Sequence, residues 1–353
     1  MRASPTQGRT ELWTPQELAR SEMLSITRGF FREPDDFEAA MRDDGCASLV
    51  VTQRGPFRAR LSRIALHWLR LQNAEESSAR VAFFTIPAGS TVVFIPIGHS
   101  LPPVWDGASA CAGEIITVSG GHRTHTRSAT GGRWGTLLLP TRILESYAET
   151  LNGSSLVLPT GVSLWRPTFT LYRQLVRIHL SATGVASTRA AVLTTSEPAR
   201  SLEQELMDAL TACLLEGGPV PRRHAQARHG DVMARFEDLL AAHPTRSWTL
   251  AALSEALDLS GRLLRICCDE HLGMGPNAYI RLRRMQLVRR ALGHADPTVA
   301  TVAQVAAAYG FPEAGRFSGA YRTNFGELPS ATLRRGAPNE RVLRIAPRRA
   351  KFA

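Results

Sequence analysis

Residues 301–335 read TVAQVAAAYGFPEAGRFSGAYRTNFGELPSATLRR, and this stretch decides how the C-terminal third of the chain folds. Its first nine residues have the pattern of a short helix, Gly310-Phe311-Pro312 mark a turn, and EAGRFSGAYRTNFG has the pattern of a second helix. A short helix, a tight turn and a second helix form the layout of a helix-turn-helix unit. We therefore predict such a unit here.

The same layout occurs once more upstream. TLAALSEAL (249–257) is followed by the turn Asp258-Leu259-Ser260 and by GRLLRICCDEHLG. Between the two units lies a continuous helical pattern from Pro276 to His294, about 28 Å long at about 1.5 Å per residue. Successive major-groove faces on one side of B-DNA lie about 34 Å apart. The spacing predicts two reading units held in adjacent turns of the groove by one stiff helix.

Residues 249–335 resemble the DNA-binding domain of the AraC/XylS transcription regulators. The resemblance is carried by Gly310-Phe311, Phe317, Tyr321, Phe325-Gly326 and Pro329 in the second unit and by LAALSEALDLSGRLL in the first. The first unit departs from the family at Ser254 and Asp258, where the family has alanine and glycine.

The resemblance implies that the helices beginning near Ser260 and Glu313 enter the major groove. Arginine can bond guanine O6 and N7 together, which makes arginines at these helix starts candidates for base reading. The candidate DNA-binding residues are Arg262, Arg265, Glu313, Ala314, Arg316 and Gly319. The candidates for phosphate contact are Arg281, Arg284, Arg289, Arg290 and Arg322.

Composition agrees with a polyanionic partner. The 353 residues carry a formal net charge of +11, almost all from arginine, because Lys351 is the only lysine. Residues 229–353 hold 18 basic and 11 acidic residues, a net charge of +7. A basic balance suits nucleic acid, although membrane surfaces and simple solvation are also compatible with it.

The N-terminal two thirds have a different pattern. Short apolar runs separated by glycine and proline between residues 45 and 140, with alternation at Phe57, Ala59 and Leu61, predict a cupin-like sandwich or barrel. Helical periodicity follows at 141–216, and its apolar faces suit either dimer formation or packing against the sheet. GGPVPRRHAQARHG at 217–230 is predicted to be a linker between two parts that fold separately.

The sequence gives little indication of chemistry. His122 and His125 are spaced His-x-x-His rather than the His-x-His of metal-binding cupins, so a turn between strands is predicted there, with no metal and no cofactor. Two enzyme alternatives remain open, a cupin-like metal enzyme and an alkyl-transfer DNA-repair protein with an appended DNA-binding domain. The first alternative needs a set of metal-ligating residues and the second needs a reactive cysteine, and the sequence shows no pattern typical of either.

The expected fold is therefore α+β, with a sensory and dimerisation part at 1–216, a linker at 217–230, an all-α DNA-binding domain at 231–336 and a basic tail at 337–353. The expected function is that of a non-enzymatic, sequence-specific transcription regulator, an activator or a repressor. Its expected partners are double-stranded DNA, a second copy of the chain, a small-molecule or protein effector and, for an activator, RNA polymerase. Scattered cysteines and the lack of an apolar leader predict a cytoplasmic protein without membrane contact.

Overall fold

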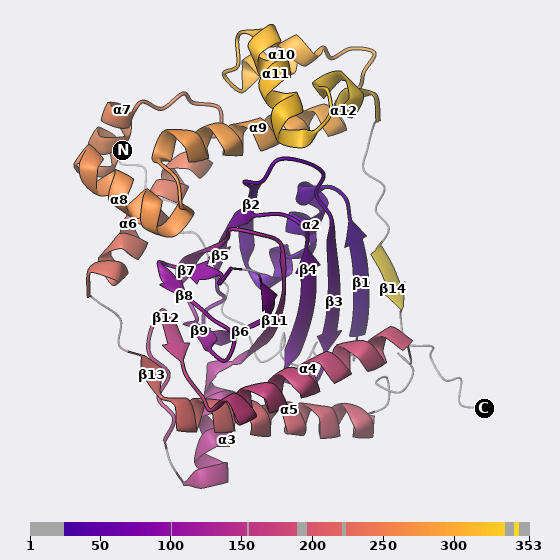
Figure 1. Ribbon diagram of the computed structural model, residues 1–353, viewed down its shortest axis with the longest axis vertical. Helices are drawn as coiled ribbons and strands as arrows, with labels where there is room; N and C mark the ends of the chain where they lie inside the picture. Colours follow the sequence, from indigo (N-terminus) through magenta and orange to yellow (C-terminus); the bar gives the residue numbers. More distant parts are fainter. Residues whose placement is uncertain are drawn as a thin grey trace, which may run out of the picture.

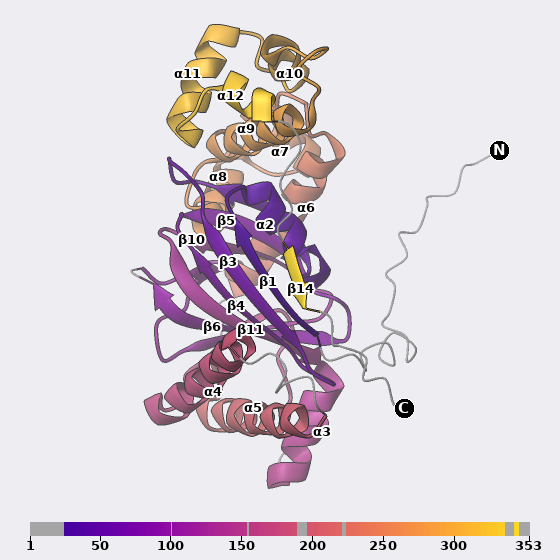
Figure 2. The ribbon, with the colours of Figure 1, turned by 90° about the vertical axis from the view of Figure 1, so that its right-hand side faces the viewer.

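The computed structural model describes residues 25–99, 101–153, 155–188, 196–220, 224–335 and 342–345. In chain order, a β-rich part is followed by three helices on one side of it and by a helical C-terminal part at the opposite end (Figures 1 and 2). The predicted basic tail at 337–353 lies outside the described residues except for the strand β14.

Two antiparallel sheets form the β-rich part. The larger sheet has the strand order β13-β12-β9-β6-β11-β4-β3-β1-β14, and the smaller has the order β2-β5-β10-β7-β8. The strands of the larger sheet are β1 (Ser25–Phe31), β3 (Ala59–Ala65), β4 (Arg70–Glu76), β6 (Ser90–His99), β9 (Ile115–Ser119), β11 (Gly132–Pro140), β12 (Val162–Trp165), β13 (Pro219–Val220) and β14 (Val342–Ile345). The strands of the smaller sheet are β2 (Cys46–Val51), β5 (Arg80–Thr85), β7 (Val104–Trp105), β8 (Ala108–Ser109) and β10 (Arg123–Ser128).

A hydrophobic core fills the space between the two sheets. It includes Phe57, Ala59 and Leu61, the residues whose alternation with arginine predicted a half-buried strand. The predicted sandwich is confirmed. The sheets extend beyond the predicted limits of 45 and 140, since β1 begins at Ser25 and β12 lies at 162–165. Before residue 45, β1 and the short helix α2 (Pro34–Ala40) bury only scattered side chains, Phe37 among them.

Three helices cover the outer face of the larger sheet. They are α3 (Thr141–Asn152), α4 (Phe169–Thr188) and α5 (Ser196–Gly217), within the region 141–216 where the periodicity predicted helices, and α4 and α5 lie as a pair (Figure 2). Tyr172, Leu206 and Cys213 from this pair join Ile64 and Leu71 from the sheet in a second core. Of the two roles left open for these apolar faces, the structure shows packing against the sheet.

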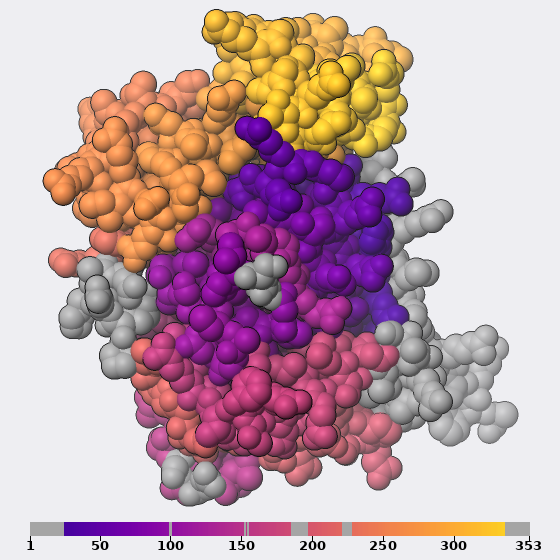
Figure 3. All heavy atoms as spheres, viewed as in Figure 1, coloured from indigo at the N-terminus to yellow at the C-terminus, as the bar shows by residue number. Residues whose placement is uncertain are grey.

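The C-terminal part is entirely helical over its described residues 224–335. Its helices are α6 (His224–Ala242), α7 (Leu250–Leu257), α8 (Gly261–Leu272), α9 (Pro276–His294), α10 (Val302–Ala308), α11 (Ala314–Phe325) and α12 (Pro329–Arg335). The predicted linker segment at 217–230 contains β13 and the start of α6. The helices lie directly against the β-rich part, as the space-filling view shows (Figure 3). Val50 and Val81 from the smaller sheet join the core of α6–α9.

Candidate nucleic-acid interface

The first helix-turn-helix unit consists of α7 and α8, and short polar caps set its ends. The Thr249 hydroxyl accepts from the Ala252 N–H at 3.2 Å, and the Ser260 hydroxyl accepts from the Leu263 N–H at 3.2 Å. Asp258 closes α7 in the left-handed conformation, with φ +54° and ψ +54°. This conformation favours glycine, and aspartate is one of the few other residues that adopts it. Caps and turn thus fix the angle between the two helices.

The exposed face of α8 presents the predicted reading residues of this unit. Arg262 and Arg265 are both exposed, whereas Leu264 and Cys268 are buried in the core below them. The neighbouring Ile266 is 46% exposed, which adds an apolar patch of the kind that contacts a thymine methyl group. The structure therefore brings Arg262 and Arg265 onto one accessible surface.

The second unit consists of α10 and α11. Thr301 and Gln304 form a reciprocal capping box at the start of α10, and Gly310 turns the chain with φ +75°. Glu313, Ala314, Arg316 and Gly319 are all exposed at the start of α11, as predicted from the position of the turn. The Arg316 side chain is 85% exposed, and its Nε lies 3.1 Å from Glu313 Oε2. DNA would therefore compete with Glu313 for this guanidinium group.

The connecting helix α9 has the bounds that the sequence predicted, Pro276–His294. Two of its arginines meet carboxylates of the N-terminal part rather than solvent. Arg289 Nη2 lies 2.6 Å from Glu33 Oε2, and Arg290 Nη2 lies 2.8 Å from Asp35 Oδ1 and 3.0 Å from Glu38 Oε1. Phosphate contact by Arg289 and Arg290 stays a prediction, and it requires these ion pairs to open.

Arg284 has a structural position inside the second unit. Its Nε donates to the Tyr309 carbonyl at 2.8 Å and its Nη2 to the Gly310 carbonyl at 2.6 Å. The guanidinium carbon lies 4.9 Å from the centre of the Phe311 ring. Arg284 thus holds the end of α10 against α9, a role the sequence did not suggest. Among the remaining phosphate candidates, Arg281 and Arg322 are exposed.

A buried polar cluster joins the first unit to the β-rich part, and sequence reasoning missed it. The residues His125 of β10 and Glu237 of α6 lie 3.0 Å apart between Nε2 and Oε1, and each is at most 2% exposed. Tyr279 of α9 donates to Glu237 at 2.6 Å, and Arg283 forms an ion pair with the same carboxylate. Burial alone would raise the pKa of Glu237, but Arg283 and His125 outweigh it and lower the pKa to about 2.

Asp106 and His271 complete this cluster. Asp106, in the turn after β7, accepts from the backbone N–H of His125 at 2.9 Å and from His122 Nε2 at 3.0 Å. Burial opposes the charge of Asp106, but the hydrogen bond from His122 and the His271 imidazole 3.5 Å away keep its pKa below the usual range. His125 lies within a strand, so the prediction of a turn was wrong at this position; the turn is at Gly120-Gly121. No local pattern relates Asp106 and His125 to His271, which is 146 residues further along the chain than His125.

Within the described residues, no helix is both long and apolar enough to span a membrane. Comparison with known proteins matches residues 253–335 to the model of a helix-turn-helix domain. The XylDLEGF operon transcriptional activator 1 of Pseudomonas putida is 41% identical over 90 residues, which are 26% of this chain and 27% of that protein. The probable thc operon regulatory protein of Rhodococcus erythropolis is 36% identical over 97 residues, 28% of this chain and 29% of the relative.

These curated relatives are thus matched over less than a third of their length. Among solved structures, the AraC-like transcriptional activator CuxR aligns with 74% of this chain and 94% of its own, at 16% identity and a TM-score of 0.40. A probable AraC family transcriptional regulator from Rhodopseudomonas palustris aligns with 31% of this chain and 99% of its own, at 30% identity and a TM-score of 0.28.

Proposed function

We propose that the protein is a sequence-specific DNA-binding transcription regulator of the AraC/XylS type, since residues 253–335 match the model of a helix-turn-helix domain and are similar to an operon activator. The observation that carries the proposal is the pair of units on one connecting helix, each with exposed arginine at the start of its second helix. Arg262 and Arg265 read bases in one turn of the major groove, and Arg316 reads bases in the next. Arg281 and Arg322 contact phosphates.

The β-rich part acts in this proposal as the sensory part. The support is its direct contact with the first unit, because a change in the sandwich reaches α8 without a flexible connection. The effector is a small molecule or a protein, RNA polymerase is a partner if the protein activates transcription, and the protein acts in the cytoplasm. Homodimer formation stays a prediction, since the apolar faces of α4 and α5 pack on their own sheet.

An enzyme alternative finds less support. Alkyl transfer to cysteine requires an accessible thiolate. Burial raises the pKa of Cys213 to about 12 and that of Cys267 to about 11. Cys111 is exposed, but the side chain that its backbone N–H meets is the Glu114 carboxylate, at 2.7 Å, and not a cation that would favour a thiolate. The buried polar cluster is likewise closed to a substrate, since Asp106, His125 and His271 are each at most 2% exposed. We therefore propose a binding function rather than catalysis.

The test is a selection of preferred DNA from a random pool by the full-length protein, followed by titration on the selected site. Neutralisation of about six phosphates gives a log–log salt slope near −5. Arg316→Ala weakens binding to the selected site by about 1–3 kcal/mol and relaxes the preference at one or two base pairs. Arg281→Ala is the matched control, because this exposed arginine lies on α9 and weakens all sequences about equally.

Three results would overturn the proposal: no enriched sequence, an affinity that does not change with salt, or two arginine variants that cannot be distinguished on selected and scrambled DNA. Sedimentation of the same full-length sample reports whether the protein is a dimer.

A further inference from the structure

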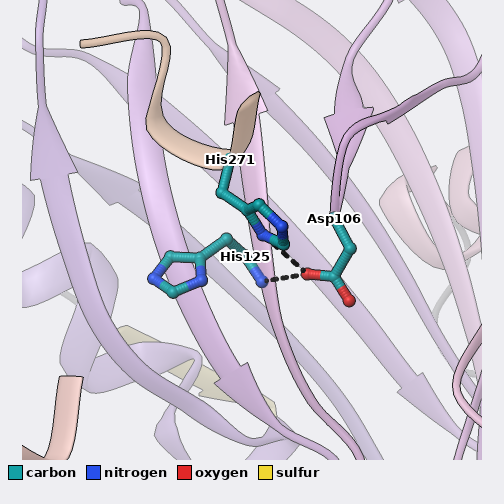
Figure 4. Close-up of side chains that lie close together, drawn as sticks. All are labelled: Asp106, His125 and His271. Atoms are coloured by element: carbon teal, nitrogen blue, oxygen red, sulfur yellow. Dashed lines mark hydrogen bonds and ion pairs between the residues drawn. The ribbon is translucent and has the colours of Figure 1, made fainter. Parts of the chain in front are cut away.

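Three buried side chains from distant parts of the chain converge at the boundary between the sandwich and the first unit. Asp106 comes from the turn after β7, His125 from the middle of β10, and His271 from the last turn of α8 (Figure 4). One ligand atom from each lies within 4.8 Å of the other two. All three residues are buried, so this convergence is not a chance grouping of surface charges.

The distance between His271 and Asp106 suits two ligands of one metal ion better than a hydrogen bond. His271 Nδ1 lies 3.5 Å from Asp106 Oδ1, too far for a strong bond between an imidazole and a carboxylate. In a tetrahedral zinc site with bonds of about 2.0–2.1 Å, neighbouring ligand atoms lie about 3.3–3.4 Å apart. Both ring nitrogens of His271 lack a hydrogen-bond partner among the described residues, and the side chain is fully buried. Such burial is unfavourable unless something binds the nitrogen lone pair.

The surroundings of His125 are those of a metal ligand. Glu237 is an ion-paired carboxylate and can only accept, so His125 Nε2 carries the hydrogen in their 3.0 Å bond. The His125 Nδ1 atom therefore keeps its lone pair for a ligand. A carboxylate that receives the second N–H of a histidine is the usual outer partner of metal-bound imidazole. His122 similarly holds the second oxygen of Asp106 at 3.0 Å, which fixes the carboxylate.

We propose that Asp106, His125 and His271 bind a divalent transition metal ion of the zinc class. Two imidazoles and one carboxylate are a ligand set that zinc and its neighbours accept, with a fourth position left for water. The ion bridges the β-rich part and α8, so it fixes the first unit relative to the sandwich. Metal binding is measured without DNA, so this proposal and the proposed function can fail separately.

The experiment uses the full-length chain without a histidine tag, stripped with a chelator and titrated with Co²⁺ in the presence and absence of competing Zn²⁺. One equivalent of Co²⁺ is expected to give the visible absorption of a low-coordinate site, and Zn²⁺ removes it. His271→Gln and Asp106→Asn each remove a ligand and lower the affinity by at least about 100-fold, more than the loss of an outer partner. His294→Gln, at an exposed histidine of α9, and Cys111→Ser, at an exposed thiol, leave the affinity unchanged.

Thermal unfolding of the unaltered protein gives a second measurement that does not depend on the folding of any variant. Zn²⁺ is expected to raise the Tm, because an ion that binds only the native state stabilises it by mass action. The proposal is overturned by the absence of binding at one equivalent, by an unchanged Tm at saturating Zn²⁺, or by folded His271→Gln protein that binds as tightly as the original. Loss of binding in Cys111→Ser would show an adventitious ion only and would also overturn it.

Discussion

The two helix-turn-helix units of this protein share a layout but differ in what surrounds them. The core of the first unit includes Val50 and Val81 of the sandwich, and its helix α8 ends at the buried cluster with Asp106 and His125. The core of the second unit, over the described residues, is built from α9–α12 and their loops alone. The second unit meets the N-terminal part through polar contacts, such as the 3.2 Å bond from the Gly55 N–H to the Asn324 carbonyl of α11.

This difference indicates that the two units of one tandem domain can have different roles. A change in the sandwich reaches the first unit through packed side chains and buried charge, whereas the second unit is held mainly by α9. The second unit also keeps the glycine at its turn, Gly310, where the first has Asp258. Under the proposed function, the first unit is therefore the one that would respond to an effector, and the second would read DNA more independently.

The largest expected effect concerns the buried charge beneath the first unit. Glu237→Gln leaves the Arg283 guanidinium without its carboxylate in a buried setting, and we expect the free energy of unfolding to fall by about 3–5 kcal/mol. Asp238→Asn is the matched control one residue away, because its 2.6 Å pair with Arg123 is exposed and contributes less than about 1 kcal/mol. Urea unfolding of both variants measures the difference. An equal loss of unfolding free energy in both variants would mean that the first unit does not depend on buried charge. The contrast drawn between the two units would then be wrong.

A smaller effect is expected within the second unit. Arg284→Ala removes the bonds to the Tyr309 and Gly310 carbonyls and should destabilise this unit by about 1–3 kcal/mol. Arg281→Ala, on the exposed side of the same helix, should change stability by less than about 0.5 kcal/mol. Hydrogen exchange should show faster opening of α10 and α11 in Arg284→Ala and no change in α7 and α8. Opening of both units together would show that they are not independent.

The smallest effect tests a departure of the first unit from the AraC/XylS pattern that it resembles. The Ser254 hydroxyl is buried without a partner and lies close to Gly261, where the two helices of the unit approach. Ser254→Ala is expected to raise the free energy of unfolding by about 1 kcal/mol, because it removes an unsatisfied polar group. Ala306 is the corresponding buried alanine of the second unit, and Ala306→Ser should lower stability by a similar amount. A loss on Ser254→Ala would indicate that the hydroxyl has a partner in solution.

The helices of the DNA-binding domain were predictable because their signals are local. Thr249, Ser260 and Thr301 cap helices within three residues of themselves, and Pro276 begins α9 where the sequence places it. The strand β2 has the bounds of the apolar run CASLVV at 46–51. A strand that is buried in a sheet leaves a run of apolar residues in the sequence, so its limits can be predicted from the sequence. The strand β1 was missed because it lies near the edge of its sheet and buries only Ile26 and Phe31.

The sequence by itself determined the tandem domain, the sandwich and the exposed arginines at the helix starts, because caps, turns and periodicity act over a few residues. Only the tertiary structure decided which charges meet. It pairs Arg289 and Arg290 with carboxylates of the helix α2 and of Glu33, the residue before it, more than 250 positions away. It also places His271 beside Asp106 and His125. The physical reason is that the sequence gives the residue type of a charged side chain or an imidazole but not its partner, which can be solvent, phosphate, metal or a distant carboxylate. The packing of the helical part against the β-rich part determines which partner each side chain has.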